Sequence, residues 1–182
     1  IAPIPLVTTF NYAPGTTVPI PAGYINDAVN SWINQNTTAY DTNGFALQAA
    51  DVSGATTTLE RDITLNAADS NAVLSFNWKL QDDGSGRSLI LNVYQDGDLT
   101  TPYATQSISS FNTWVSSSPV TLTAGHTYSI CWVYSDADTS NNHTQTAWVD
   151  NVTIAAPSET FEYPTGTTVP IPAGYINDAV NS

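Results

Sequence analysis

The stretch AVLSFNWKL, residues 72–80, decides the fold of this chain. Its five even-numbered residues are all apolar, and the polar residues Ser75 and Asn77 stand between three of them. Successive side chains of an extended strand point to opposite faces, so Leu74, Phe76, Trp78 and Leu80 share one face. The stretch therefore predicts a β-strand with one face in the core and the other toward solvent.

Six further stretches have the same strand character. They are residues 44–50, 56–65, 88–95, 114–122, 127–134 and 146–154. Turn-forming residues separate them, for example DGSG at 83–86 and DGD at 96–98. No stretch has apolar residues at helical spacing. This pattern predicts an all-β protein, an antiparallel jelly-roll β-sandwich.

The chain also repeats itself. Residues 10–31 read FNYAPGTTVPIPAGYINDAVNS and residues 161–182 read FEYPTGTTVPIPAGYINDAVNS, at an offset of 151 residues. Self-similarity at a fixed period indicates a repeat architecture. We therefore divide the chain into an inter-repeat linker at 1–9, one sandwich repeat at 10–156, and a linker with the opening segment of the next repeat at 157–182.

The second copy of the duplicated segment has no sandwich of its own within this chain. If it were left alone, its apolar side chains would form an unpaired edge segment. Two alternatives follow: it begins the next domain of a covalent array, or it is a strand donated to a neighbouring subunit. In either case the inter-repeat junction contains Phe161, Tyr163, Val169, Ile171 and Tyr175.

Composition limits the partners of the chain. Sixteen acidic residues face only three basic ones, for a formal net charge of −13. Such a chain offers little to nucleic acid or to an anionic membrane, because both are bound through Lys and Arg. The single cysteine, Cys131, lies in an apolar run and is expected to be a buried, inert thiol. No apolar stretch reaches the ~20 residues that span a bilayer.

The order of several short motifs resembles a known family. PAGY at 21–24, NGFAL at 43–47, LSFNW at 74–78 and the closing WVDNVTI at 148–154 follow one another in one unit. This order resembles the MAM-like and cleaved-adhesin group of jelly-roll domains in bacterial surface proteins. The resemblance implies an extracellular, non-catalytic domain for adhesion or glycan binding, often in tandem. It also implies that a first strand at 9–12 pairs near the last strand.

The resemblance further implies a structural calcium ion near the junction of the first and last strands. The matching positions are Asn11, Asp41, Asn43 and Asp150. Carboxylate and amide oxygens are the ligands that Ca²⁺ takes. The alternatives are a simple turn for Asp41 and a strand-end hydrogen bond for Asp150.

Other side chains suggest surface roles rather than catalysis. His126 and His143 lie in turn-like contexts with no recognisable nucleophile, so no catalytic residue is predicted. Acceptor patterns for N-glycosylation occur at Asn36, Asn142 and Asn151. Aromatic rings near loops stack on sugars when exposed, and the alternative is core or subunit contact. The candidates for glycan contact are Trp32, Tyr40, Tyr103 and Trp114.

These observations predict a non-enzymatic structural repeat of an extracellular filament or giant surface adhesin. Units are joined end to end through the duplicated segment, so the main partners are copies of the chain itself. The alternative function is a carbohydrate-binding module of a secreted or surface protein, whose partner is a glycan.

Overall fold

The computed structural model describes residues 6–8, 20, 22–41, 44–81, 86–108, 111–139 and 146–155. Within these residues there are strands and no helix. The strands are β1 (Leu6–Thr8), β2 (Tyr24–Asn26), β3 (Ile33–Gln35), β4 (Ala46–Gln48), β5 (Ala55–Thr64), β6 (Ala72–Leu80), β7 (Arg87–Gln95), β8 (Ala104–Ser107), β9 (Val115–Ser116), β10 (Val120–Leu122), β11 (Thr127–Asp136) and β12 (Ala147–Ala155).

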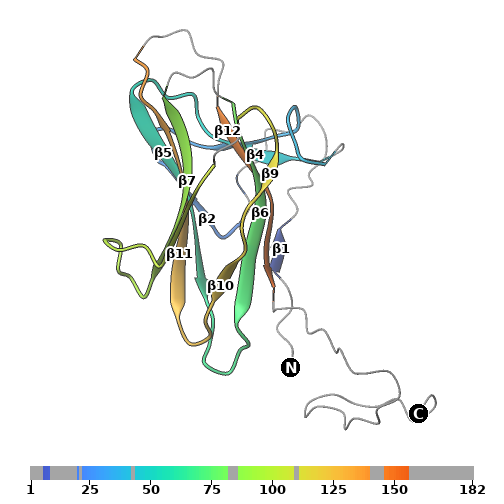
Figure 1. Ribbon diagram of the computed structural model, residues 1–182, viewed down its shortest axis with the longest axis vertical. Coiled ribbons are helices and arrows are strands. Elements are labelled where there is room, and N and C mark those ends of the chain that lie inside the picture. The colour runs from blue at the N-terminus through green and yellow to red at the C-terminus, as the bar shows by residue number, and fades with distance from the viewer. Residues whose placement is uncertain are drawn as a thin grey trace, which may run out of the picture.

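The strands form two antiparallel sheets packed face to face (Figure 1). One sheet has the order β10-β6-β12-β4-β3, with β1 also paired to β12 and β9 to β6. The other has the order β2-β5-β11-β7-β8. Neighbouring strands come from distant parts of the chain, as in a jelly roll. The predicted all-β antiparallel sandwich is confirmed.

The core lies between the sheets and follows the predicted alternation. In β6, Leu74, Phe76, Trp78 and Leu80 are all buried. The opposite sheet contributes Leu89, Leu91 and Val93 from β7 and Ile130, Trp132 and Tyr134 from β11. The ring of Phe76 contacts both Trp78 and Trp132 edge to face, with centroids 5.2 and 5.5 Å apart. Aromatic contacts across the sheets therefore join the two layers.

Two of the three basic residues are also inside. Arg87 of β7 forms a fully buried ion pair with Asp136 of β11, with Nε 3.0 Å from Oδ2. Arg61 of β5 is only 5% exposed. The predicted burial of Cys131 is confirmed, and burial raises its pKa to about 12, with the charges of Glu60 and Asp62 adding to the shift. A thiol with so high a pKa is not a nucleophile near neutral pH.

The expected strand at 114–122 is in fact two short strands, β9 and β10. Pro119 has no N–H to donate to a ladder, and it precedes β10. In the gap, the Ser117 hydroxyl accepts a hydrogen bond from the Phe76 N–H, and the Ser117 N–H donates to the Phe76 carbonyl. Ser117 therefore keeps the segment between β9 and β10 hydrogen-bonded to β6, in part through its side chain.

The beginning of the sandwich differs from the expected boundary. Leu6–Thr8, which we placed in the linker, forms β1 and pairs antiparallel with Val152–Ile154 of β12. The chain therefore already pairs with the last strand at residues 6–8, before the expected strand at 9–12. The residues 9–12 that we expected in this strand lie outside the described residues, as do Asn11 and the whole of 156–182.

Candidate functional site

A bulge in β12 lies next to a buried acidic residue, Asp150. The register between β12 and β6 shifts between Asp150 and Thr153, and Asn151 has a positive φ of 50°. Asp150 pairs with Asn77, and the neighbouring pair is Val149 with Trp78. Because Val149 and Trp78 face the core, Asp150 and Asn77 face the outside of the seven-stranded sheet. The bulge begins directly after this pair, and bulges are over-represented next to active sites.

The Asp150 carboxylate is nevertheless only 2% exposed. The segment before β4 covers it: the Tyr40 N–H donates to Asp150 Oδ2 at 2.9 Å. The Asn151 N–H donates to Oδ1 at 2.7 Å. Burial raises the pKa of Asp150, these two hydrogen bonds oppose the shift, and the nearby charge of Asp41 adds to it.

Asp41 and Asp150 therefore lie in one cluster although they are far apart in sequence. The side chain of Asn151 links them, because its Nδ2 donates to Asp41 Oδ2 at 3.4 Å. Two of the four expected calcium ligands, Asp41 and Asp150, are thus brought together. The other two, Asn11 and Asn43, lie outside the described residues.

The chemistry of this cluster fits a hard divalent cation. A buried carboxylate with a raised pKa beside a second carboxylate is short of positive charge, which a cation would supply. Each Asp150 oxygen accepts one hydrogen bond, so lone pairs remain for a ligand bond. In the described part of the chain, no group of three or more His, Cys, Asp or Glu side chains could hold a metal by itself. Backbone carbonyls, amides or water would have to complete the site.

An aromatic pair stands beside the acidic cluster. The rings of Tyr40 and Trp114 meet edge to face with centroids 6.0 Å apart. Tyr40 is 47% exposed, and Trp114 is half-buried. An exposed aromatic ring next to hydrogen-bonding carboxylates and amides is the chemistry with which proteins bind sugars.

The other two aromatic candidates lie elsewhere. Trp32 is 1% exposed and belongs to the core, so its prediction as a surface contact for glycans is wrong. Core contact, the alternative that we give for this tryptophan, is the one that the structure shows. Tyr103 is 43% exposed, but its hydroxyl donates to the Thr121 carbonyl and its ring packs on Tyr128. Tyr103 is therefore not part of the Tyr40–Trp114 pair.

A pocket that the sequence did not predict opens beside β9. Its volume is about 320 Å³, and its lining comes from β6, β8 and β9 with their flanking residues: Trp78, Gln106, Ser107, Ile108, Val115, Ser116 and Ser118. Gln106 closes this edge of the sandwich, since its side chain both donates to the Ser118 carbonyl and accepts from the Ser118 N–H. The pocket brings Ser107, Ser116 and Ser118 close to Trp78, and Val115, the residue after Trp114, also lines it.

The predicted glycosylation sites differ in environment. Asn36 is exposed, whereas Asn151 is half-buried and its Nδ2, the atom that would carry a glycan, donates to Asp41. Asn142 lies outside the described residues. Glycosylation at these positions stays a prediction.

The first copy of the duplicated segment supplies β2, the edge strand of the five-stranded sheet. The Tyr24 hydroxyl accepts a hydrogen bond from Arg61 Nη1 at 3.0 Å, and the Arg61 guanidinium lies 4.8 Å from the centre of the Tyr24 ring. The same ring lies 6.2 Å from that of Trp132. Tyr24 therefore anchors the segment on the inside of the sandwich.

The residues after Tyr24 fix the turn that leads to β3. The Asn26 side chain donates to the Trp32 carbonyl and accepts from the Trp32 N–H. Asp27 Oδ1 accepts from the Asn30 and Val29 N–H groups, which lowers the pKa of Asp27. The Thr57 hydroxyl of β5 donates to the Asn30 carbonyl. The segment thus reaches its place through its own polar residues and through contacts to β5.

These features define an antiparallel jelly-roll β-sandwich with an acidic and aromatic cluster on one outer face. No protein-family model matches the chain, and no curated protein matches it. The comparison with solved structures finds the same fold in several binding proteins.

One similar structure is the cleaved adhesin domain of Lys-gingipain from Porphyromonas gingivalis, with a TM-score of 0.57 and 17% identity over 86% of this chain and 100% of that one. Another is the CBM22-1 xylan-binding domain of Xyn10C from Paenibacillus barcinonensis, with a TM-score of 0.53 and 13% identity over 82% of this chain and 92% of that one. A third is TmCBM61 in complex with β-1,4-galactotriose, with a TM-score of 0.50 and 10% identity over 74% and 87%.

Identities this low establish the fold alone. The expected resemblance to cleaved-adhesin domains is confirmed at that level, and its MAM-like part stays a prediction. None of the described residues forms a helix long and apolar enough to span a membrane.

Proposed function

We propose that this chain is a non-enzymatic structural repeat of an extracellular filament or surface adhesin, in which sandwich units follow one another through the duplicated segment. The observation that carries the proposal is the role of the first copy. Tyr24, Asn26, Asp27 and Asn30 hold β2 in place, and residues 166–182 repeat all four in an identical sequence.

The second copy therefore contains the same four residues with which the first copy contacts the sandwich. Its partners on the sandwich side, Arg61, Thr57 and Trp132, occur once in this chain and already contact the first copy. One chain has one place for the segment and two copies of it. A second sandwich is the place that the second copy fits.

The mass of the intact natural material on a denaturing gel tests this proposal. A covalent array gives a band, or a ladder, far above the 19.4 kDa of this chain. A single band near that mass, from material that is also monomeric under native conditions, would refute self-linking altogether. A single band from material that is polymeric under native conditions would instead support strand exchange between subunits.

A second candidate function is carbohydrate binding, favoured by the exposed ring of Tyr40, which packs on the half-buried Trp114 beside Asp41 and Asp150. Two of the similar structures are, by name, a xylan-binding domain and a module in complex with a galactotriose. Titration with xylan and galactan oligosaccharides tests it. Binding that is lost in Tyr40→Ala and kept in Tyr103→Ala, a similarly exposed tyrosine, would support a site at the pair; no binding by the intact chain would exclude these glycans.

The same cluster is proposed to bind a structural calcium ion. Asp41 and Asp150 would hold it through their carboxylates, and the ion would neutralise the buried charge and fix the Tyr40 segment over the sheet. The role of the ion in this proposal is structural.

A further inference from the structure

The chain enters and leaves the sandwich at the same end. β1 and β12 run antiparallel, and Leu6 pairs with Ile154 (Figure 1). At this end β12 reaches Ala155, which pairs with Val73 at the start of β6. Because paired strands lie about 4.8 Å apart, the entering and the leaving chain are neighbours. We call this end the chain-end pole; it consists of the β5–β6 turn, residues 65–71, and the β10–β11 turn, residues 123–126.

The turns at the chain-end pole are bound firmly to one another. The Gly125 N–H donates to the Leu65 carbonyl at 2.8 Å, and the Leu65 N–H donates to the His126 carbonyl at 3.0 Å. The Ala124 N–H donates to Asn71 Oδ1 at 3.0 Å. The β5–β6 and β10–β11 turns therefore form one body.

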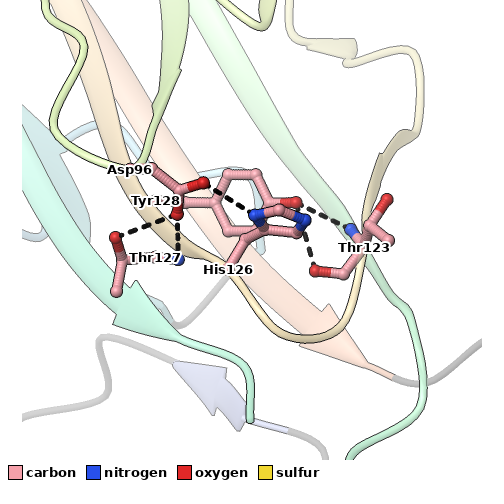
Figure 2. A network of polar contacts seen from close by, with 5 residues as sticks. All are labelled: Asp96, Thr123, His126, Thr127 and Tyr128. Atoms are coloured by element: carbon pink, nitrogen blue, oxygen red, sulfur yellow. Dashed lines mark hydrogen bonds and ion pairs between the residues drawn. The ribbon is translucent and has the colours of Figure 1, made fainter. Parts of the chain in front are cut away.

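Figure 2 shows how the turn after β7, which begins with Asp96, joins these two turns. His126 Nδ1 lies 2.7 Å from Asp96 Oδ2, and Asp96 Oδ1 accepts from the Thr127 N–H. On the other side, the Tyr128 hydroxyl both donates to the Thr123 carbonyl and accepts from the Thr123 N–H. The pole at which the chain leaves is thus a braced surface rather than a set of separate loops.

The connection to the next unit is short compared with the sandwich. β12 ends at Ala155, and the position that corresponds to Leu6, the first residue of β1, lies 151 residues later at Pro157. At about 3.5 Å per residue, the two steps from 155 to 157 reach at most about 7 Å. The ten residues of β11 extend over about 33 Å at 3.3 Å each. The connection is therefore too short to run from one end of a sandwich to the other.

We propose that consecutive units of the array meet through their chain-end poles, with a second copy of this chain as the partner of that surface. This inference rests on the proposed function. In such an array the units do not follow one another head to tail; their chain-end poles lie together, and their opposite ends point away from one another. Each unit begins and ends at this pole, so its opposite end takes no part in the linkage. With a net charge of −13 per chain, neighbouring units repel each other sideways and spread apart.

The arrangement keeps the candidate site accessible. Asp150 lies five residues along β12 from Ala155, about 16 Å from the chain-end pole. Tyr40 and Trp114 lie beside Asp150. The cluster is therefore outside the surface that the next unit covers, and every unit of an array presents its own copy to solvent.

Distances between spin labels in a two-unit protein test the proposal. Residues 1–182 are followed directly by a second copy of residues 32–156, so that the natural junction is kept. Ala68→Cys in both units labels the chain-end pole, and Ala137→Cys in both units labels the opposite end; both alanines are exposed. Cys131 stays unlabelled because it is buried.

Units that diverge from a shared pole give a separation for the Ala68→Cys pair at most half of that for the Ala137→Cys pair. A head-to-tail chain keeps the orientation of each unit and gives equal separations. Equal separations, or a shorter distance at the opposite end, would overturn the inference. Because the two units are joined covalently by design, this result is independent of the mass of the natural material, which tests the proposed function separately.

Discussion

Replacing the same tyrosine in the two copies of the duplicated segment separates their roles. Tyr24→Ala and Tyr175→Ala are identical changes in identical surroundings of sequence, since residues 166–182 repeat residues 15–31. Only Tyr24 has a described place in the sandwich. We expect Tyr24→Ala to destabilise the unit and Tyr175→Ala to leave its stability unchanged.

The expected loss follows from the contacts of Tyr24. A hydrogen bond from the charged Arg61 is worth about 1.5–3 kcal/mol, its position over the ring about 0.5–2 kcal/mol, and the contact with Trp132 about 0.5–1.5 kcal/mol. These terms share partners and do not add fully, so we expect a loss of about 2–4 kcal/mol. At about 3 °C per kcal/mol for a domain of this size, Tm falls by about 6–12 °C.

Urea unfolding followed by tryptophan fluorescence measures the effect, because Trp132 lies next to Tyr24. Tyr24→Phe is the intermediate case: it keeps the ring and loses the hydroxyl, so it should cost less than the alanine variant. Equal losses from Tyr24→Ala and Tyr175→Ala would contradict the reasoning, because the second copy would then also hold a place in a folded sandwich. A dependence of that loss on protein concentration would identify exchange between chains.

Four further predictions concern single groups. Arg87→Met leaves Asp136 charged and buried, so it should cost about 3–5 kcal/mol in urea unfolding, more than the loss of any exposed ion pair. Asp150 has a raised pKa in the folded state, so the native chain holds more protons than the unfolded one and stability should fall as pH rises above the ordinary carboxyl pKa; Asp150→Asn should flatten this slope, as thermal unfolding at several pH values will show. Calcium at 100 times its Kd should stabilise the intact chain by about 2.7 kcal/mol and Asp150→Asn much less, whereas an equal response of both would exclude this carboxylate as a ligand. Cys131 should react with a thiol reagent at pH 8 only after unfolding, and rapid reaction of the native chain would show that its burial is not maintained.

The long strands were predictable because their periodicity records burial directly. In β6 every second residue is apolar and buried, and this is the face that the alternation predicts for the core. The short strands β2, β3 and β8 were missed. Three or four residues at a sheet edge carry too little alternation to stand out, and their pairing depends on partners far away in sequence.

The candidate site was predictable only in part. Asp41 and Asp150 were named from a resemblance, and they do lie together. Trp32 is a candidate for glycan contact with core contact as its alternative, and the core surrounds it. The pocket beside β9 and the bulge at Asn151 left no signal in the sequence, because both arise where strands from different parts of the chain meet.

The amino-acid sequence by itself determined the fold class of this protein and the presence of a duplicated segment. Alternation of apolar and polar residues predicts strands with one buried face, and the repeat is visible without any coordinates. Only the tertiary structure decided where the chain enters and leaves the sandwich. The pairing of Leu6 with Ile154 depends on two segments almost 150 residues apart, and no local pattern encodes such a contact. That one pairing places Leu6 and Ile154, where the chain enters and leaves the sandwich, at one pole, and our proposal for how successive units meet rests on it.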